Sequence, residues 1–124
     1  MNFLQGVDIV ENLRVERIYI RYGSIFLKKI LNNQELKFIP SKEKQVINFI
    51  SGRFAAKEAL SKAIGTGFRN GINFRTFSVL NDSLGKPIVI LQNEGQEYLK
   101  KKKINLNNLH INLSISHEKK FSIA

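Results

Sequence analysis

The chain contains no cysteine among its 124 residues. This absence excludes disulfides, a thiolate nucleophile and metal sites built on cysteine. Long apolar runs are missing too, because none approaches the roughly 18 residues of a membrane span. The opening segment, MNFLQGVDIV, has no basic region before its apolar residues and does not resemble a secretory signal. We therefore expect a cytoplasmic protein that does not act at a membrane.

Acidic residues are also scarce. Ten Asp and Glu stand against 20 Lys and Arg, which gives a net charge of +10. Such a charge predicts an anionic partner, and nucleic acid, a polyphosphate cofactor and an acidic protein all satisfy it. The chain has no helix-turn-helix, zinc-finger or RNA-recognition signature and no Walker motif. Its length and its hydrophobic content of 43% predict one domain over residues 1–124.

The segment Gly52–Gly67, GRFAAKEALSKAIGTG, is the most informative in the chain. Projected at about 100° per residue, its apolar side chains surround the axis, which predicts a helix buried on several sides. The segment also carries four charged residues, and buried charge is costly unless it is paired or bound to metal. An ordinary explanation is an ion pair between Glu58 and Lys62, one turn apart.

Helical periodicity predicts three helices. The first covers about 11–31 with a break near Gly23, and the last covers 92–103. The long central helix should run over about 42–64, with Ser41 as its N-cap and Gly65 as its stop.

Alternation of apolar and polar residues predicts the strands. Residues 82–86 are expected to form a hairpin turn, and 117–118 a second turn. Strands are expected over 3–10, 74–81, 87–91 and 109–116, and from Phe121 onward.

Three groups of polar residues have two readings each. Asp8 is a poor strand former, so it either caps the next helix or binds a metal. His117 follows an expected strand, where it either packs or contacts a ligand. Arg14, Arg17 and Arg21 form a basic stripe, which is either a solvated face or a docking surface for an acidic helix. The residues alone do not choose between these readings.

Four separated segments resemble the holo-acyl-carrier-protein synthases, the small class of 4′-phosphopantetheinyl transferases. Three of these segments are short: Gly-x-Asp-Ile-Val at 6–10, Gly-Lys-Pro at 85–87 and Ser-x-Ser-His at 114–117. The chain departs from the family in ending at Ala124, where members usually continue for several residues. The central motif, F-x-x-K-E-A-x-x-K-A-x-G-x-G, is matched by Phe54, Lys57, Glu58, Ala59, Lys62, Ala63, Gly65 and Gly67.

The resemblance implies an α+β fold in which an antiparallel sheet wraps around a long central helix. It implies transfer of the 4′-phosphopantetheine group from coenzyme A to a serine of apo-acyl carrier protein, in fatty acid biosynthesis, with release of adenosine 3′,5′-bisphosphate. The implied cofactor is Mg²⁺, and coenzyme A is the co-substrate. The implied partners are acyl carrier protein and two further copies of the chain, with the active site between subunits of a trimer, and not nucleic acid.

Transfers of this kind depend mainly on positioning and on neutralising oxygen charge, and a divalent cation does both. Magnesium typically takes one or two carboxylates plus phosphate oxygens, so Asp8 and Glu58 are the expected metal ligands. Lys62 lies one turn after Glu58 and can reach a phosphate, which makes Glu58 and Lys62 the expected catalytic residues. Glu58 acting through water, or a metal-bound water, is a candidate base for the serine proton.

The remaining candidate contacts are to coenzyme A and to the carrier. Gly65, Thr66 and Gly67 form a loop with little side-chain bulk, so its backbone can approach the cofactor closely. The resemblance further implies carrier contacts at Arg14 and Arg21. It adds Arg53, Lys62, Pro87 and His117 as cofactor contacts.

Three other functions compete with this one. A nucleic-acid-binding module would explain the net charge. A magnesium-dependent nuclease would use Asp8 and Glu58 with a lysine, although common nuclease sites have Glu-x-Lys and here Lys62 follows Glu58 by four. An inert interaction domain leaves the four co-occurring motifs unexplained.

Overall fold

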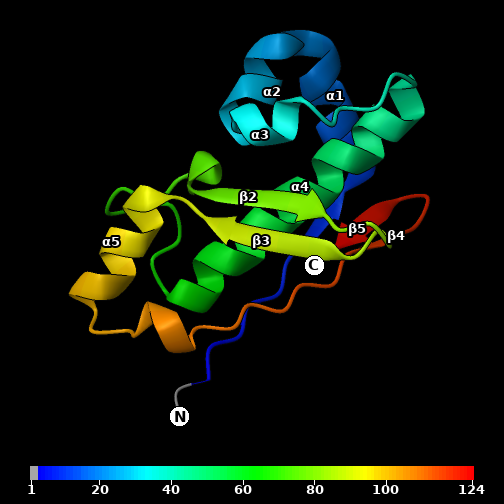
Figure 1. The fold of residues 1–124 in the computed structure, drawn as a ribbon. Helices are drawn as coiled ribbons and strands as arrows, with labels where there is room; N and C mark the ends of the chain where they lie inside the picture. The colour runs from blue at the N-terminus through cyan, green and yellow to red at the C-terminus, as the bar shows by residue number, and fades with distance from the viewer. Residues whose placement is uncertain (1–2) are drawn as a thin grey trace.

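The computed structural model describes residues 3–124, and helix α4 (Glu43–Ile64) is the axis around which they are arranged (Figure 1). The helix begins one residue later than expected, with Lys42 rather than Ser41 as its N-cap. It ends at Gly65 as expected, because glycine adopts the left-handed conformation there (φ 89°) without a steric penalty. The predicted central helix is therefore confirmed, and the predicted N-cap is wrong.

The expected first helix is two helices, α1 (Asn12–Tyr22) and α2 (Ser24–Ile30), which meet at Gly23. Gly23 has φ 53°, so the predicted break is confirmed. A further short helix, α3 (Asn33–Leu36), was not expected. It is held by a capping box in which the Asn32 side chain and the Glu35 side chain each bond the other residue's backbone N–H.

The strands form two antiparallel sheets rather than one. A three-stranded sheet has the order β1 (Ile9–Glu11), β5 (Phe121–Ile123), β4 (Ser116–His117). The second sheet is the hairpin of β2 (Phe77–Asn81) and β3 (Pro87–Leu91).

The strands predicted over 3–10 and 109–116 are mostly wrong. Residues 3–8 and 109–115 are not in strands and lie along α4, although Asp8 extends the β1–β5 pairing by exchanging two backbone hydrogen bonds of 3.0 Å with Ala124. A Cβ added to Gly6 would stand 1.9 Å from the carbonyl oxygen of Ala59, so the backbone there rests directly on the helix. This close approach brings Asp8, two residues later, to the second half of α4.

The hairpin turn over 82–86 is confirmed. Asp82 accepts backbone N–H bonds from Leu84 and Lys86 at its Oδ1, and Gly85 has φ 85°. The strand predicted from residue 74 begins at Phe77 instead, because a capped 3₁₀ turn, η1 (Phe74–Thr76), precedes it. Helix α5 (Asn93–Lys101) is confirmed with slightly shorter bounds, and a second 3₁₀ turn, η2 (Leu106–Asn108), follows it.

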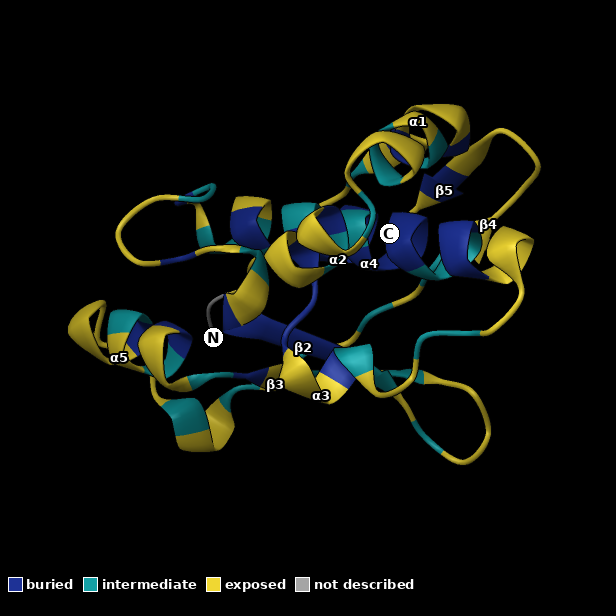
Figure 2. Cartoon of the chain, turned by 90° about the horizontal axis from the view of Figure 1, so that it is seen from above, coloured by how far each residue is buried: buried dark blue, intermediate teal, exposed yellow. Residues whose placement is uncertain are grey.

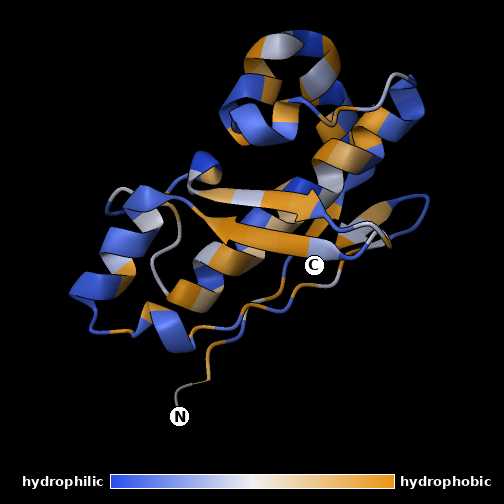
Figure 3. Cartoon of the chain, in the orientation of Figure 1, coloured by the Kyte–Doolittle hydropathy of each residue, from blue (hydrophilic) through white to orange (hydrophobic). Residues whose placement is uncertain are grey.

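The core has two parts, one at each end of α4. The first joins α1 and α2 to the front half of the helix, and the second joins β2, β3 and α5 to its back half. Figure 2 shows that α4 and β2 carry much of the buried surface, and Figure 3 shows the apolar residues gathered on β2, β3 and α4. None of the helices formed by residues 3–124 has the length and apolar character needed to cross a bilayer.

Candidate functional site

The structure brings Asp8, Glu58 and Lys62 together. Lys62 donates from Nζ to Asp8 Oδ1 at 2.9 Å and to the carbonyl oxygen of Val7 at 3.2 Å. Lys62 projects from α4 one turn after Glu58, and Asp8 comes from the segment that Gly6 seats on the helix. The ordinary alternative, an ion pair between Glu58 and Lys62, does not form among residues 3–124, because Lys62 pairs with Asp8.

Glu58 lies in an environment that disfavours its charge. Partial burial, and next the negative charge of Asp8, raise the pKa of Glu58, against the smaller opposing effects of Lys62 and Arg14. A positive charge near Asp8 and Glu58 would reduce the repulsion between the two carboxylates. Lys62 supplies part of it, and its side chain is 53% exposed while that of Asp8 is 15% exposed.

This arrangement fits a magnesium ion. Residues 3–124 hold no cluster of three or more His, Asp or Glu side chains that could enclose a metal. Magnesium usually binds through one or two carboxylates and keeps its other positions for water and phosphate oxygens. Asp8 and Glu58 are therefore a donor set suited to magnesium held jointly with a phosphate substrate.

The charge on Lys57 is explained by a partner that sequence reasoning missed. Lys57 and Glu35 form a salt bridge, and both side chains are fully buried. Lys57 also donates to the carbonyl oxygen of Ile30, while Glu35 accepts from the backbone N–H groups of Asn32 and Val79. Burial lowers the pKa of Lys57 to about 8, and the attraction of Glu35 opposes this shift. The only signal in the sequence was the Asn32–Glu35 capping-box pattern.

Arg53 lies on α4, with its guanidinium 3.6 Å from the centroid of the Phe49 ring. It is buried, and its Nε has no hydrogen-bond partner among residues 3–124. Burial lowers the pKa of Arg53 to about 10, partly offset by the charge of Glu35. An orphaned, buried guanidinium nitrogen is costly, so the site suits an incoming anion.

His117 lies against α4 beside Arg53. A Cβ added to Gly52 would stand 2.6 Å from Cε1 and 3.1 Å from Nε2 of the ring, so the ring in this position lies directly on the glycine backbone. Nδ1 of His117 lies 3.0 Å from Ser122 Oγ. Burial, and next the charge of Arg53, lower the pKa of His117.

The glycine loop follows α4 directly. Gly65 and Gly67 both have positive φ (89° and 56°), and the N–H of Gly67 donates to the carbonyl oxygen of Ser61 at 3.2 Å. Thr66 donates its hydroxyl to the Gly67 carbonyl oxygen at 2.6 Å.

Pro87 is not near this loop within one subunit. It starts β3, and the opposite end of that strand packs with the end of α4.

Arg53 and Glu58 face different ways. They are five residues apart on one helix, which is about 140° around the axis and roughly 8 Å along it. One subunit therefore does not present Arg53, His117 and Glu58 to a single small ligand. Arg14 and Arg21 are exposed on α1, which fits both a solvated face and a docking surface, and Arg14 is close enough to influence the charge of Glu58.

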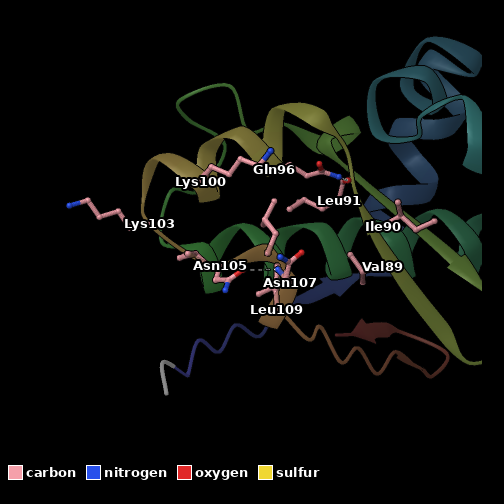
Figure 4. Close-up of a pocket in the computed structure, with 11 residues that line it drawn as sticks. Val89, Ile90, Leu91, Gln96, Lys100, Lys103, Asn105, Asn107 and Leu109 are labelled. Carbon is pink, nitrogen blue, oxygen red and sulfur yellow. Dashed lines mark hydrogen bonds between the residues drawn. The ribbon is translucent and has the colours of Figure 1, made fainter.

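The cavities of the single chain lie elsewhere. One of about 770 Å³ lies between β3, α5 and residues 103–109, with Lys100 and Lys103 among its lining residues (Figure 4). Another of about 470 Å³ is lined by polar residues around Asn32 and Arg75. Neither includes Asp8, Glu58 or His117.

The sequence matches one family model over residues 5–114, and that model is described as the 4′-phosphopantetheinyl transferase superfamily. The holo-[acyl-carrier-protein] synthase of Pelagibacter ubique is 42% identical over 119 residues, which cover 96% of this chain and 90% of that protein. The holo-[acyl-carrier-protein] synthase of Vibrio parahaemolyticus is 42% identical over 120 residues, with the same coverage.

Solved structures show the same similarity. The crystal structure of holo-[acyl-carrier-protein] synthase from Neisseria meningitidis has a TM-score of 0.86 and 34% identity, covering 99% of this chain and 94% of that one. A synthase from Bacillus anthracis in complex with coenzyme A (3′,5′-ADP) has a TM-score of 0.76 and 37% identity, covering 97% and 90%. The Helicobacter pylori synthase in complex with coenzyme A has a TM-score of 0.80 and 29% identity, covering 97% and 95%.

Proposed function

Because this chain belongs to the 4′-phosphopantetheinyl transferase superfamily, we propose that Asp8, Glu58 and Lys62 form its transfer site. The reaction is transfer of the 4′-phosphopantetheine group from coenzyme A to a serine of apo-acyl carrier protein, which supports fatty acid biosynthesis. The observation that carries the site is the convergence of Asp8 from the N-terminal segment with Glu58 and Lys62 from α4. Such convergence is what separates these residues from ordinary surface charges.

Glu58 and Lys62 are the catalytic residues in this proposal. Lys62 is half exposed and flexible enough to leave Asp8 for a phosphate oxygen, where its charge lowers the cost of the charge that builds up during transfer. Glu58 has a raised pKa, so it is a better proton acceptor than an ordinary surface carboxylate. We place it, through a water molecule, as the group that takes the proton of the carrier serine.

Asp8 and Glu58 would hold magnesium. When bound there, the ion neutralises and orients the pyrophosphate oxygens of coenzyme A. The two carboxylates supply a shared negative charge that Lys62 only partly balances. Lys62 would then be freed from Asp8 to bind substrate.

The rest of coenzyme A is assigned to a second group of residues. Arg53 and His117 are placed on its 3′-phosphate or adjacent groups, because the unpaired Nε of Arg53 needs an acceptor. The backbone of Gly65, Thr66 and Gly67 is placed beside the cofactor, where positive φ and small side chains allow close approach. We assign Pro87 to the cofactor on family resemblance alone.

A homotrimer is part of the proposal. The outer face of the β1–β5 pair exposes Ile9, Phe121 and Ile123 at 58%, 40% and 42%, which is an apolar face with no cover in one subunit. Arg53 and Glu58 point apart on α4, so a cleft between two subunits would allow Arg53 of one to meet Glu58 of the next. One chain has a mass of 14.2 kDa, and light scattering of the protein in solution should give three times this mass. Ile9→Lys should lower the measured mass. A parent protein with the mass of a single chain would contradict the trimer.

Arg14 and Arg21 are the proposed contacts to the carrier, since α1 presents both to solvent and Arg14 is close enough to Glu58 to influence its charge. We place the reaction in the cytoplasm.

The decisive experiment is mass spectrometry of apo-acyl carrier protein after incubation with the chain, coenzyme A and Mg²⁺. The carrier should gain the mass of one phosphopantetheine arm, and a chelator should prevent this. Asp8→Asn and Glu58→Gln should each reduce the rate by about 100-fold or more, the loss typical for removal of a charge-stabilising group. Glu97→Gln, at an exposed acid on α5, should leave it unchanged. Magnesium binding followed by calorimetry should be lost in the first two variants and kept in the third.

A further inference from the structure

A series of hydrogen bonds lies behind His117 and joins three elements. Asn12 on α1 and Ser122 on β5 are both buried, at 6% and 0% exposure. Ser122 Oγ lies 3.0 Å from Nδ1 of His117 and donates to Oδ1 of Asn12 at 2.7 Å. Nδ2 of Asn12 donates to the carbonyl oxygen of Glu118 at 2.9 Å. Residues from both ends of the chain therefore meet behind one imidazole ring.

The direction of these bonds follows from which atoms can donate. The Glu118 carbonyl oxygen can only accept, so the amide nitrogen of Asn12 faces it and the amide oxygen faces Ser122. That oxygen also only accepts, so it takes the single hydroxyl proton of Ser122. Ser122 Oγ is then left to accept from His117, which places the ring proton on Nδ1. Nε2 is the nitrogen that remains for a ligand.

Nε2 is the ring nitrogen that lies against α4. Together with Cε1 it lies on the bare backbone of Gly52, next to Arg53 in the sequence of α4. It makes no hydrogen bond with any residue in the range 3–124. After burial, the positive charge of Arg53 is the second cause that lowers the pKa of His117.

We propose that Asn12 and Ser122 are positioning residues that hold His117 as the Nδ1–H tautomer and so present Nε2 to bound coenzyme A. The identity of the ligand rests on the proposed function, whereas the tautomer is a property of the free protein. With the ring neutral, Nε2 accepts a hydrogen bond from a hydroxyl or amino group of the cofactor. With the ring protonated, Nε2 donates to a phosphate oxygen. Asn12 and Ser122 act in both cases through His117, without touching the ligand.

The tautomer is tested in the free protein. The chain has two histidines, so His110→Gln, a change at an exposed position, leaves His117 as the only imidazole. In ¹⁵N-labelled protein, long-range proton–nitrogen correlation above the pKa of the ring should show a protonated Nδ1 and an unprotonated Nε2. Ser122→Ala should shift the ring toward the Nε2–H form. A parent ring that is protonated at Nε2 instead would overturn the proposal without any variant having to fold.

The positioning role is tested by steady-state kinetics. Ser122→Ala should raise KM for coenzyme A by about 5- to 10-fold, the effect of one loosened hydrogen bond, with kcat unchanged. Ser122→Thr retains the hydroxyl and should restore both the tautomer and KM. Ser83→Ala, at an exposed serine of the hairpin turn, is the matched control and should change neither.

Two outcomes remain distinct. A changed tautomer with unchanged KM in Ser122→Ala would overturn the positioning role. A parent protein that transfers nothing to apo-acyl carrier protein would overturn the proposed function, and presentation to coenzyme A with it. The nitrogen spectrum would still decide the tautomer in that case.

Discussion

At the scale of single residues, Glu58 is placed where its charge costs folding stability. Its pKa is raised by partial burial and by Asp8, so the folded protein holds the Glu58 proton more tightly than the unfolded chain does. Above the raised pKa, the charged side chain therefore destabilises the fold. A bound cation would offset this cost, which links the feature to the proposed function.

We predict that Glu58→Gln raises the melting temperature at pH 7 when a chelator is present, even though it slows transfer. The reason is that glutamine removes the disfavoured charge and keeps the shape of the side chain. Differential scanning fluorimetry in the chelator measures the shift. Glu97→Gln on the exposed face of α5 is the matched control and should move the melting temperature little. A Glu58→Gln variant that melts below the parent would contradict this placement of Glu58.

His117 gives a second residue-scale prediction, this time in pH. Burial and Arg53 lower its pKa below the ordinary value of 6.5, so the unfolded chain binds this proton more readily than the folded one. Stability from this group is therefore complete above about pH 6.5 and falls as the pH drops toward the lowered pKa. We predict that the parent loses more thermal stability between pH 7.5 and about pH 5 than His117→Gln does.

The matched control for this comparison is His110→Gln, which removes the exposed histidine. It should keep the parent's dependence on pH over the same interval. Equal slopes for the parent and His117→Gln would contradict a pKa of His117 lowered by partial burial and Arg53.

At the scale of elements, the Lys57–Glu35 pair joins α3 and the middle of β2 to α4. Glu35 is bonded to Asn32, Val79 and Lys57, and Lys57 also reaches the carbonyl oxygen of Ile30 in α2. We predict that Lys57→Met lowers the free energy of unfolding by about 3–5 kcal/mol, because Glu35 is left buried without its cation. Urea unfolding followed by circular dichroism measures this.

Lys44→Met is the control, since Lys44 is an exposed lysine on the same helix. Its effect should stay within about 0.5 kcal/mol, the usual range for surface changes. A loss in Lys57→Met no larger than in the control would mean that the buried pair contributes nothing to joining these elements.

The elements that could be predicted are those fixed by local signals. Three boundaries lie where expected because backbone conformation sets each of them. They are the end of α4 at Gly65, the end of α1 at Gly23 and the turn over 82–86. The strand over 109–116 was wrong because alternation records which side chains are covered, and not whether another strand or a helix covers them. Residues 109–115 alternate because they lie along α4.

Some residues of the candidate site could be identified from the sequence and others could not. Asp8, Glu58 and Lys62 belong to motifs with several matching residues, so the sequence alone identified them. The ion pair of Glu35 and the hydrogen bonds of Asn12 and Ser122 could not be identified in this way, because these contacts join residues 22, 106 and 110 positions apart, and no local pattern records such partners. The buried partner of a motif residue is set by tertiary packing, so it becomes visible only in the folded chain.

At the scale of the whole molecule, the net charge of +10 is spread over several surfaces, and only part of it faces the proposed transfer site. Arg14 and Arg21 lie on α1, the helix whose Arg14 influences the charge of Glu58, whereas Lys100 and Lys101 lie at the end of α5. Long-range attraction depends on total charge, but specific docking depends on where the charge lies. Charge reversals at the two places separate these contributions.

We predict that Arg14→Glu with Arg21→Glu raises KM for acyl carrier protein by about 10-fold or more, the effect of placing like charges across an interface. Lys100→Glu with Lys101→Glu changes the net charge by the same amount and should raise KM much less. Transfer rates measured against carrier concentration at low and moderate salt make the comparison. The parent and the α5 variant should lose affinity as salt rises, while the α1 variant should depend on salt only weakly, because its attractive contacts are gone. Equal effects of the two reversals would mean that the carrier responds to overall charge, and the docking surface on α1 would have to be abandoned.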